Sequence, residues 1–317
     1  MPEISVIIPA YNMEEYIGDT IESVQKQTFD DYELIVVDDG STDDTYKILT
    51  KYAKNDARII LLSQDNAGVS IARNNGIEHA SGKYITFLDG DDLWTPDALQ
   101  IMYERIKSEN AGFVYAGYAD LYPDGIGKKE TSTNYGKEGT LRDFLHYTGE
   151  VRMPFMMGTI MMSMELLRKY RIRFAPGIKI FEDVGFQMTL LCFTRVVFVD
   201  AVVLLYRIRE GSAVHGAWEN PQKWDGGVRM FDFIEPIVEQ GSIEAQRIVK
   251  RVRSYKAYRF IVDCLRHGFI DDASIYIREW DTSLRQFLRE SGKWNDHLKC
   301  RLMLLNQIWL LRVLSKF

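Results

Sequence analysis

The chain has 317 residues, of which 46% are hydrophobic and 26% charged, and these proportions are typical of a globular protein with a normal core. Its formal net charge of −6 is unevenly spread. Residues 244–317 carry 15 Lys and Arg against 8 Asp and Glu, a net of +7, whereas the rest of the chain carries 24 against 37, a net of −13. An acidic body with a basic end does not resemble a nucleic-acid-binding protein. Three distant cysteines predict neither a zinc site nor a disulfide framework.

The chain ends carry little targeting information. The start runs directly into a predicted strand without a signal peptide, and no stretch reaches the roughly 18 apolar residues of a membrane-spanning helix. Together with cysteines that are expected to be reduced, these two observations indicate a cytoplasmic protein. The segment Leu298–Phe317 combines an apolar helical stripe with only basic charges; the stripe consists of Leu298, Leu302, Leu305, Trp309 and Val313. It predicts a peripheral contact with the inner face of a membrane or, alternatively, docking on the chain's own core or in a homodimer.

Strands and helices alternate over the first 95 residues with short links between them. This alternation predicts a parallel sheet with helices on both faces. Because crossovers between parallel strands are right-handed, all the strand-to-helix turns should lie at one edge and line one crevice. Strands are expected at Ile4–Ile8, Tyr32–Val37, Arg58–Leu62 and Tyr84–Leu88, and helices at Glu14–Gln27, Asp43–Lys54 and Val69–Ala80.

The second part of the chain has a more mixed pattern. A polar, Gly-rich stretch at Tyr122–Gly139 is expected to be a mobile loop, of the kind that often covers a site. From Pro221 onward the pattern is helical, with breaks near three glycines. The other expected elements are helices from Pro96 to Glu109, Leu141–Tyr147, Met164–Tyr170 and Glu182–Leu191, and strands at Phe113–Ala119, Val196–Val199 and Val202–Arg207.

The stretch Tyr84–Trp94 is a buried strand that ends in acidic residues. Its first five residues are apolar on both faces, and Asp89, Asp91 and Asp92 follow with only one glycine among them. Such close carboxylates repel one another, and a hard divalent cation such as Mg²⁺ or Mn²⁺ relieves the repulsion. We interpret the cluster as a metal–diphosphate site at the carboxyl edge of the sheet. The alternative is that the aspartates cap the next helix or occupy a solvated turn.

Two further features at this predicted edge have two interpretations each. Asp38 and Asp39 end the second strand, where a carboxylate accepts a hydrogen bond from a base or ribose, or else caps the next helix. Arg73 lies in the third predicted helix. We interpret it either as a residue that binds a base or phosphate or as a solvated surface arginine. No Gly-x-Gly-x-x-Gly and no Gly-x4-Gly-Lys-Ser/Thr is present, which argues against a dinucleotide fold and a P-loop.

Acidic and basic candidates also occur later in the chain. Glu182 and Asp183 begin a predicted helix. The pattern alone favours the interpretation that these acids only interact with the helix dipole. Arg207 and Arg209 are phosphate-type donors at the end of a strand. His215 is a candidate metal ligand, although the pattern alone favours a loop histidine.

Five ordered motifs give the chain a resemblance to family-2 glycosyltransferases with the GT-A fold. They cover roughly residues 1–215 and are strongest over residues 1–95. The motifs are IPAYN at Ile8–Asn12, VVDDGSTD at Val36–Asp43, NAGVSIARNNG at Asn66–Gly76, GKYITFLDGDD at Gly82–Asp92 and FEDVGF at Phe181–Phe186.

The resemblance implies an inverting transferase that moves a sugar from a nucleotide-sugar, with UDP favoured, to an acceptor hydroxyl with the help of Mn²⁺ or Mg²⁺. It implies a mostly parallel α/β domain over residues 1–220, with a nucleotide-binding half at 1–95 and an acceptor half at 96–220, and a helical region at 221–317. It also implies roles for the following residues: Asp183 as general base, Asp39 as acceptor of the uracil N3–H, Pro9, Tyr11, Arg73, Asp89 and Arg207 on the donor side, and Asp91 and His215 on the metal side.

One departure from the family pattern bears on the product. Processive members carry Gln-x-x-Arg-Trp after the base together with membrane spans, and this sequence has neither. We therefore expect transfer of a single sugar to a saccharide or lipid-linked saccharide, in polysaccharide or glycolipid assembly, with the sugar, acceptor and linkage left open. One alternative is a nucleotidyltransferase, against which the Glu182-Asp183 element and the missing Gly-rich phosphate loop near the N-terminus argue. The other is a non-catalytic nucleotide-sugar-binding module, against which the presence of both Asp91 and Asp183 argues.

Overall fold

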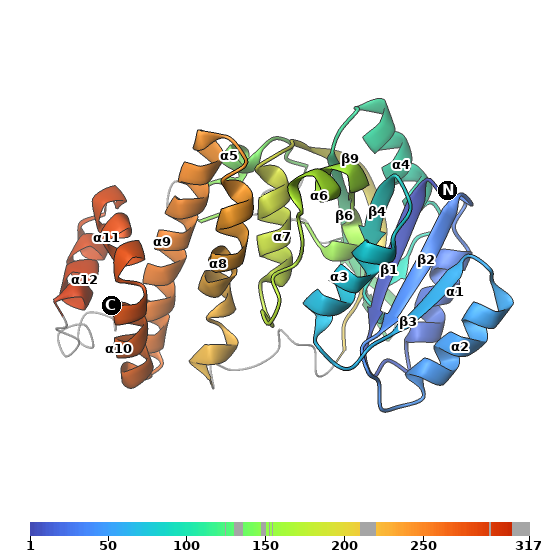
Figure 1. The fold of residues 1–317 in the computed structure, drawn as a ribbon, viewed down its shortest axis with the longest axis horizontal. Helices are drawn as coiled ribbons and strands as arrows, with labels where there is room; N and C mark the ends of the chain where they lie inside the picture. Colours follow the sequence, from blue (N-terminus) through green and yellow to red (C-terminus); the bar gives the residue numbers. More distant parts are fainter. Residues whose placement is uncertain are drawn as a thin grey trace.

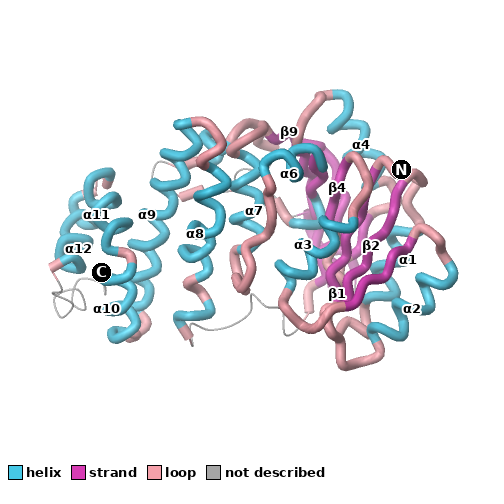
Figure 2. Tube along the Cα trace, in the orientation of Figure 1, coloured by secondary structure: helices cyan, strands magenta, loops and turns pink. Residues whose placement is uncertain are grey.

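The computed structural model describes residues 1–123, 125–129, 136–146, 150–151, 153, 155–209, 220–291 and 293–305. Within these residues nine strands form one sheet in the order β3-β2-β1-β4-β8-β6-β9-β5, with β7 paired to β6. Figure 2 shows strands in magenta lying side by side between helices in cyan. The strands are β1 (Ile4–Ala10), β2 (Tyr32–Asp38), β3 (Ile59–Ser63), β4 (Tyr84–Phe87), β5 (Leu93–Trp94), β6 (Phe113–Tyr122), β7 (Gly125–Lys129), β8 (Ile160–Ser163) and β9 (Val196–Arg207).

Helices cover the sheet and continue beyond one end of it (Figure 1). They are α1 (Ile17–Gln25), α2 (Thr45–Asn55), α3 (Val69–His79), α4 (Ala98–Ser108), α5 (Leu141–Phe144), α6 (Met164–Tyr170), α7 (Glu182–Leu191), α8 (Gly226–Val238), α9 (Ile243–Arg266), α10 (Ile270–Glu279), α11 (Asp281–Glu290) and α12 (Trp294–Leu304). Figure 1 shows α8 to α12 as a helical layer beside the sheet.

The first four strands form the parallel sheet that the sequence predicts. β1 lies between β2 and β4, all parallel, and β3 extends the sheet beyond β2. Because side chains alternate between the two faces of a strand, Ile7 packs in one core cluster, and Val6 and Ile8 pack in the other. Burial on both faces explains why β1 and β2 are mostly apolar, whereas the edge strand β3 is only partly buried.

The second half of the sheet is mixed. β8 is antiparallel to both β4 and β6, and β9 is parallel to β6. The short strand β8 is absent from the sequence prediction, because four residues of the composition Ile-Met-Met-Ser do not distinguish a strand from a helix. The two strands predicted before Arg207 are one strand whose pairing with β6 shifts register. Part of the predicted loop Tyr122–Gly139 is β7, which pairs antiparallel with β6.

The helical region shares its core with the sheet. Met230 and Phe231 of α8 and Val249 and Val252 of α9 belong to the same buried cluster as strand and α7 residues. A third cluster, around Tyr258, lies among the last helices. The predicted domain boundary at residue 220 stays a prediction, but the two regions are packed together.

The C-terminal segment is only partly described. Cys300 and Met303 of α12 are fully buried in the third cluster, whereas Leu305 is 67% exposed, and residues 306–317 of the predicted stripe lie outside the described residues. The described half therefore docks on the protein's own core. In the part of the chain that the structure describes, none of the helices combines the length and apolar character needed to cross a membrane. All three cysteines are free thiols.

Candidate active site

The predicted site is built at the carboxyl ends of β1, β2, β3 and β4. These turns are bonded to one another: the amide of Asn12 donates to Ser41 Oγ (3.0 Å) and the amide of Thr42 donates to Asn12 Oδ1 (2.8 Å). Asn12 has a left-handed backbone with φ of 52°, which asparagine adopts more readily than most residues. The parallel sheet thus brings the turns to one edge, as the strand pattern predicts.

Asp39 fastens the turn after β3 to the turn after β2. Its carboxylate is buried and accepts hydrogen bonds from Gln64 Nε2 (2.7 Å), the Ala67 amide (2.9 Å) and the Gly68 amide (2.8 Å). An ionised carboxylate has about four acceptor positions. Asp39 therefore has room for one further donor, such as the N3–H of a pyrimidine.

The two other residues predicted from the first motif differ in exposure. Pro9 is a buried residue of β1, and it pairs in the sheet with Val37. Tyr11 is 43% exposed and lies just beyond the strand. Of these two, only Tyr11 presents its side chain to solvent at the predicted donor edge.

The three aspartates after β4 have three different environments. Asp89 has a side chain 37% exposed and binds Arg73, while Asp91 has a side chain 18% exposed and binds Arg209. Asp92 is buried and accepts from the Arg207 amide (2.9 Å). Burial, together with the neighbouring Asp89 and Asp91, raises the pKa of Asp92 well above its ordinary value. Asp92 therefore joins the end of β9 to this turn, and Asp89 and Asp91 are the accessible acids.

Two guanidinium groups at the end of β9 surround Asp91. Arg209 Nε donates to Asp91 Oδ2 (2.6 Å), and Arg207 Nε donates to the Asp91 carbonyl oxygen (2.7 Å). Both guanidinium carbons lie over the ring of Tyr16, at 5.2 Å and 5.4 Å from its centroid. The edge thus holds a carboxylate and two cations within contact distance.

Arg73 is a buried bridge between two of the predicted acidic sites. Its side chain is 4% exposed, and its two terminal nitrogens donate to Asp89 Oδ1 (2.7 Å) and Glu182 Oε1 (3.0 Å). Burial alone would lower the pKa of Arg73, but Asp89 and Glu182 raise it, so the guanidinium stays charged. The structure places Arg73 between acids, and neither of its terminal nitrogens is free.

Glu182 and Asp183 open α7 directly after a strained residue. Phe181 has a left-handed backbone with φ of 76°, which a bulky aromatic residue rarely adopts and which is often found at functional sites. Glu182 is held by Arg73, whereas Asp183 Oδ1 accepts only the Val184 amide (2.7 Å). Among the described residues, Asp183 Oδ2 has no hydrogen-bond partner. Burial raises the pKa of both carboxyls, against the opposing charge of Arg73.

The structure thus brings most of the predicted residues together in two groups. Asp89, Arg73, Glu182 and Asp183 form one group, linked by the Arg73 guanidinium. Asp91, Arg207 and Arg209 form the other, and the two groups meet in the turn after β4. His215 lies outside the described residues. Asp39 belongs to the adjacent turns after β2 and β3.

The predicted site residues omit Arg209, although its partner Asp91 is among them. Arg207 is the last residue of β9 and Arg209 lies just beyond it, but no spacing rule says which of them reaches an acid. The side chains of alternate residues on a strand share a face, and this would have pointed to both arginines together.

The donor set at this edge is compatible with a divalent metal. Mg²⁺ and Mn²⁺ prefer oxygen ligands, and Mg²⁺ usually takes one or two carboxylates and completes its shell with phosphate oxygens. Asp91 Oδ1 accepts no hydrogen bond from any described residue, so it is open to a cation. No cluster of three or more metal-ligating side chains occurs among the described residues, so such a metal would depend on its substrate for further ligands.

The sequence also matches a family model. Residues 5–171, just over half of the chain, match the model of Glycosyl transferase family 2. The chain belongs to this family.

The chain is also similar to curated proteins that are named as glycosyltransferases. This glycosyltransferase is 42% identical over 125 residues to "Putative teichuronic acid biosynthesis glycosyltransferase TuaG" of Bacillus subtilis, covering 39% of this chain and 50% of that protein. It is 31% identical over 232 residues to "Glycosyltransferase GlyA" of Streptococcus pneumoniae, covering 70% of this chain and 32% of that one. The chain thus spans half or less of the length of these two relatives.

Solved structures confirm the GT-A fold. TarS 1-349 of S. aureus, in complex with UDP-GlcNAc, superposes with a TM-score of 0.76 at 20% identity, over 99% of this chain and 90% of that one. The mannosyltransferase PcManGT of Pyrobaculum calidifontis, in complex with GDP-Man and Mn²⁺, superposes with a TM-score of 0.57 at 17% identity, over 99% and 84%. At these identities the likeness establishes the fold of this glycosyltransferase and not its substrates.

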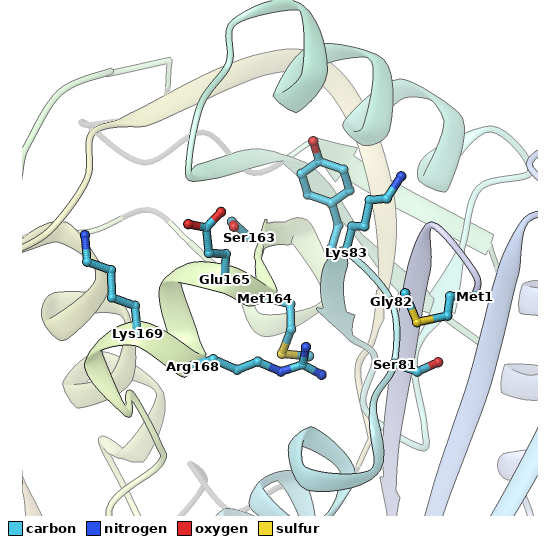
Figure 3. A pocket seen from close by; sticks show the side chains of 10 residues that line it. Met1, Ser81, Gly82, Lys83, Ser163, Met164, Glu165, Arg168 and Lys169 are labelled. Atoms are coloured by element: carbon cyan, nitrogen blue, oxygen red, sulfur yellow. The ribbon is translucent and has the colours of Figure 1, made fainter.

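A cavity of about 690 Å³ lies away from the site of this glycosyltransferase (Figure 3). It is lined by Lys83 and Tyr84 at the amino end of β4 and by Arg168 of α6, at the edge of the sheet opposite the predicted site. Lys83 pairs with Glu3, and Arg168 donates to the Ala80 carbonyl oxygen. Both cations already have partners, so the cavity adds nothing to the transfer site.

Proposed function

We propose that this enzyme is an inverting, divalent-metal-dependent glycosyltransferase that moves one sugar from a UDP-sugar to an acceptor hydroxyl. The observation that carries the proposal is the contrast between two acidic sites at one edge of the sheet. One carboxylate oxygen of Asp91 accepts no hydrogen bond from the described residues and lies beside two cations. One oxygen of Asp183 is likewise without a partner among the described residues, and burial raises the pKa of this carboxyl group. One suits a metal–diphosphate group, and the other suits a proton acceptor.

The donor would bind along the turns after β1, β2 and β4. Asp39 has one acceptor position left for the uracil N3–H. Neutral cytosine has no N3–H, and the shape of a purine is different, so the arrangement favours uracil. Tyr11 and Asp89 are the exposed side chains beside it on the donor side. In the structural neighbour TarS, complexes with UDP and with UDP-GlcNAc support the same choice of nucleotide.

The cations after β9 suit the leaving diphosphate. When the anomeric bond breaks, negative charge develops on the diphosphate, and preorganised positive groups stabilise that charge. Arg207 and Arg209 are held over Tyr16 beside Asp91 and supply this charge from the protein. A divalent metal bound by Asp91 would add Lewis-acid neutralisation of the same group. His215 is a second proposed metal ligand.

Asp183 would act on the acceptor. The acceptor hydroxyl loses its proton to the free carboxylate oxygen of Asp183 while its oxygen forms the new bond to the anomeric carbon. The bond to the diphosphate breaks, and its electron pair leaves with UDP. Attack from the face opposite the leaving group inverts the anomeric centre. General-base assistance of this kind contributes typically about 10²–10⁴-fold.

The acceptor is proposed to be a saccharide or lipid-linked saccharide of a cell-surface polymer. The relative TuaG, whose printed name places it in teichuronic acid biosynthesis, matches 39% of this chain and supports that setting. No processivity motif follows the base, so we propose one sugar per encounter rather than polymer extension.

The proposal is tested with a panel of UDP-, GDP- and CDP-sugars. The protein is incubated with each donor and Mn²⁺, and free nucleoside diphosphate is measured. We expect slow hydrolysis of a UDP-sugar, lost with a chelator and restored by Mn²⁺, and tighter binding of UDP than of GDP or CDP in competition.

Three outcomes would overturn parts of the proposal. Equal binding of GDP or CDP would remove the role of Asp39 in base selection. Turnover unaffected by chelation would remove the metal. If no donor is hydrolysed but UDP binds, the site is a nucleotide-sugar-binding module and not a transferase centre.

A further inference from the structure

A glutamine and an asparagine form a chain of hydrogen bonds that ends on Asp39. Gln64 directly follows β3, and Asn75 lies in the middle of α3. Asn75 Nδ2 donates to Gln64 Oε1 (2.7 Å), and Gln64 Nε2 donates to Asp39 Oδ1 (2.7 Å). The chain therefore connects α3 and the end of β3 to the carboxylate that is proposed to bind the base.

The two oxygens of Asp39 are not equally occupied. Each oxygen of an ionised carboxylate has about two acceptor positions. Oδ1 accepts from both Gln64 and the Ala67 amide, so its positions are filled. Oδ2 accepts only from the Gly68 amide among the described residues. The remaining acceptor position of Asp39 is therefore on Oδ2, and the bond from Gln64 closes Oδ1 to a further donor.

The side-chain amide of Gln64 has only one orientation that satisfies both of its neighbours. Such an amide has a donor end and an acceptor end. If it were turned over, its oxygen would face the Asp39 carboxylate, and its NH₂ group would face the NH₂ group of Asn75. Both hydrogen bonds would be lost, and one of them is the stronger kind that ends on a charged acceptor. Asn75 and Asp39 together therefore fix the orientation of Gln64.

The main chain around Gln64 is held as well. The Gln64 amide donates to the Asp38 carbonyl oxygen (3.0 Å), so the main chain and the side chain of Gln64 bind successive residues at the end of β2. The two turns are in close contact: a Cβ atom at Gly40, which has φ of 73°, would lie 2.8 Å from the Asn66 amide nitrogen. This packing keeps Gln64 beside Asp39.

We propose that Gln64 and Asn75 are positioning residues that set the selection of the base. Asn75 orients the Gln64 amide, and Gln64 closes Oδ1 of Asp39, so that only Oδ2 is presented to the nucleotide. The proposal rests on the proposed function, in which Asp39 accepts the N3–H of uracil. With Oδ1 open, the carboxylate would have a position for the 4-amino group of cytosine, which is a donor where uracil has a carbonyl oxygen. The preference for uracil would then weaken.

The experiment compares the calorimetric affinities of the full chain for UDP and for CDP in the presence of Mn²⁺. In Gln64→Met the ratio of the UDP affinity to the CDP affinity should fall by about tenfold, because Asp39 loses a charge-assisted hydrogen bond and Oδ1 opens. Gln25→Met is the matched control. Gln25 Nε2 donates to Asp56 Oδ2 (2.9 Å) before β3, at the opposite edge of the sheet, so this variant should keep the wild-type ratio.

A double variant separates an effect through Gln64 from a general structural effect. Asn75→Asp replaces the donor with a carboxylate, which favours the turned-over Gln64 amide, so the affinity ratio should fall. In the Gln64→Met background, Asn75→Asp should change the ratio no further, because the group that Asn75 orients is gone. An unchanged ratio in a folded Gln64→Met would overturn the proposal, as would an equal effect of Asn75→Asp in both backgrounds.

Nuclear magnetic resonance of the side-chain amides tests the orientation without a nucleotide. The Gln64 signals are assigned by their loss in Gln64→Met, and their protons should exchange with water faster in Asn75→Ala than in the wild type or in Gln25→Met. Unchanged exchange would remove the part of Asn75. If the wild type binds CDP as tightly as UDP, the base assignment of Asp39 in the proposed function is wrong and the role of Gln64 in selection falls with it. The exchange rates then still decide whether Asn75 orients Gln64.

Discussion

The acidic residues on the donor side and those on the base side have opposite environments. Asp89 and Asp91 follow a strand at the sheet edge, remain partly exposed and lie beside arginines. Glu182 and Asp183 open a helix beneath the C-terminal helices, and burial raises the pKa of both. Carboxyl groups therefore suit two tasks here: partly exposed carboxylates beside arginines are placed to bind a cation, and a carboxyl group with a raised pKa is suited to exchange protons.

Arg73 ties the two environments together. One guanidinium binds Asp89 on one side and Glu182 on the other, so the donor edge and the base are held at a fixed separation. Of the two acids that open α7, this bridge occupies Glu182 and leaves Asp183 with a free oxygen. This is the geometric reason for which we propose Asp183, and not Glu182, as the base.

The largest expected effect is on the base itself. Asp183→Asn keeps the shape of the side chain but removes the proton acceptor, so transfer to a true acceptor should fall by at least about 10²-fold while UDP affinity is retained. Turnover and calorimetric UDP binding measure the two quantities. Glu182→Gln is the matched control and should lose less activity. If Glu182→Gln is the inactive variant, the comparison between the two acids is reversed.

Removing the bridge that Arg73 forms should lower the stability of the protein rather than affect one function alone. Arg73→Met leaves Asp89 and Glu182 without their shared cation, and loss of one partner of a buried pair typically costs about 3–5 kcal/mol. Denaturant unfolding measures this against Arg58→Met, which removes a more exposed guanidinium paired with Asp56. Equal decreases in the free energy of unfolding in both variants would show that the Arg73 bridge contributes no more to stability than the more exposed Arg58–Asp56 pair.

Replacement of Asp91, the proposed metal-side acid, should weaken the metal-dependent binding of UDP. Asp91→Ala removes the proposed metal ligand, so the gain in UDP affinity from Mn²⁺ should fall by about tenfold or more, equal to about 1.4 kcal/mol or more. Calorimetry with and without Mn²⁺ gives the difference. Asp31→Ala, an exposed acid before β2 at the other edge of the sheet, is the control. Metal-dependent binding that persists in a folded Asp91→Ala would exclude this ligand.

The smallest expected effect is a shift in the pH dependence of transfer, which sharpens the comparison between the donor-side and base-side acids. The base must be ionised to accept a proton, and burial raises the pKa of Asp183. The kcat/KM for transfer should therefore rise with pH through a midpoint above the range of an ordinary aspartate, and this limb should be absent in Asp183→Asn. A limb at the ordinary aspartate pKa would mean that the base is more solvated than the structure shows.

The sequence by itself determined the donor half of the protein. Tyr84–Phe87 is largely apolar because it lies inside the sheet, between β1 and β8, and the acids that follow it mark the carboxyl edge of the parallel strands. Strand and helix periods are local properties, so the first four strands, the turns between them and α7 were predictable. The strand β8 was not, because its pairing with β4 and β6 decides its structure and four residues carry little pattern of their own.

Only the tertiary structure decided which charges meet. Arg73 and Glu182 are separated by 109 positions, and Arg209 and Asp91 by 118, so no local spacing could pair them. The sequence suggested Arg73 as a ligand contact or a surface residue, and the structure places it between two acids. Hydrophobic periodicity sets which face of an element is buried, but charge pairing depends on how the elements pack together.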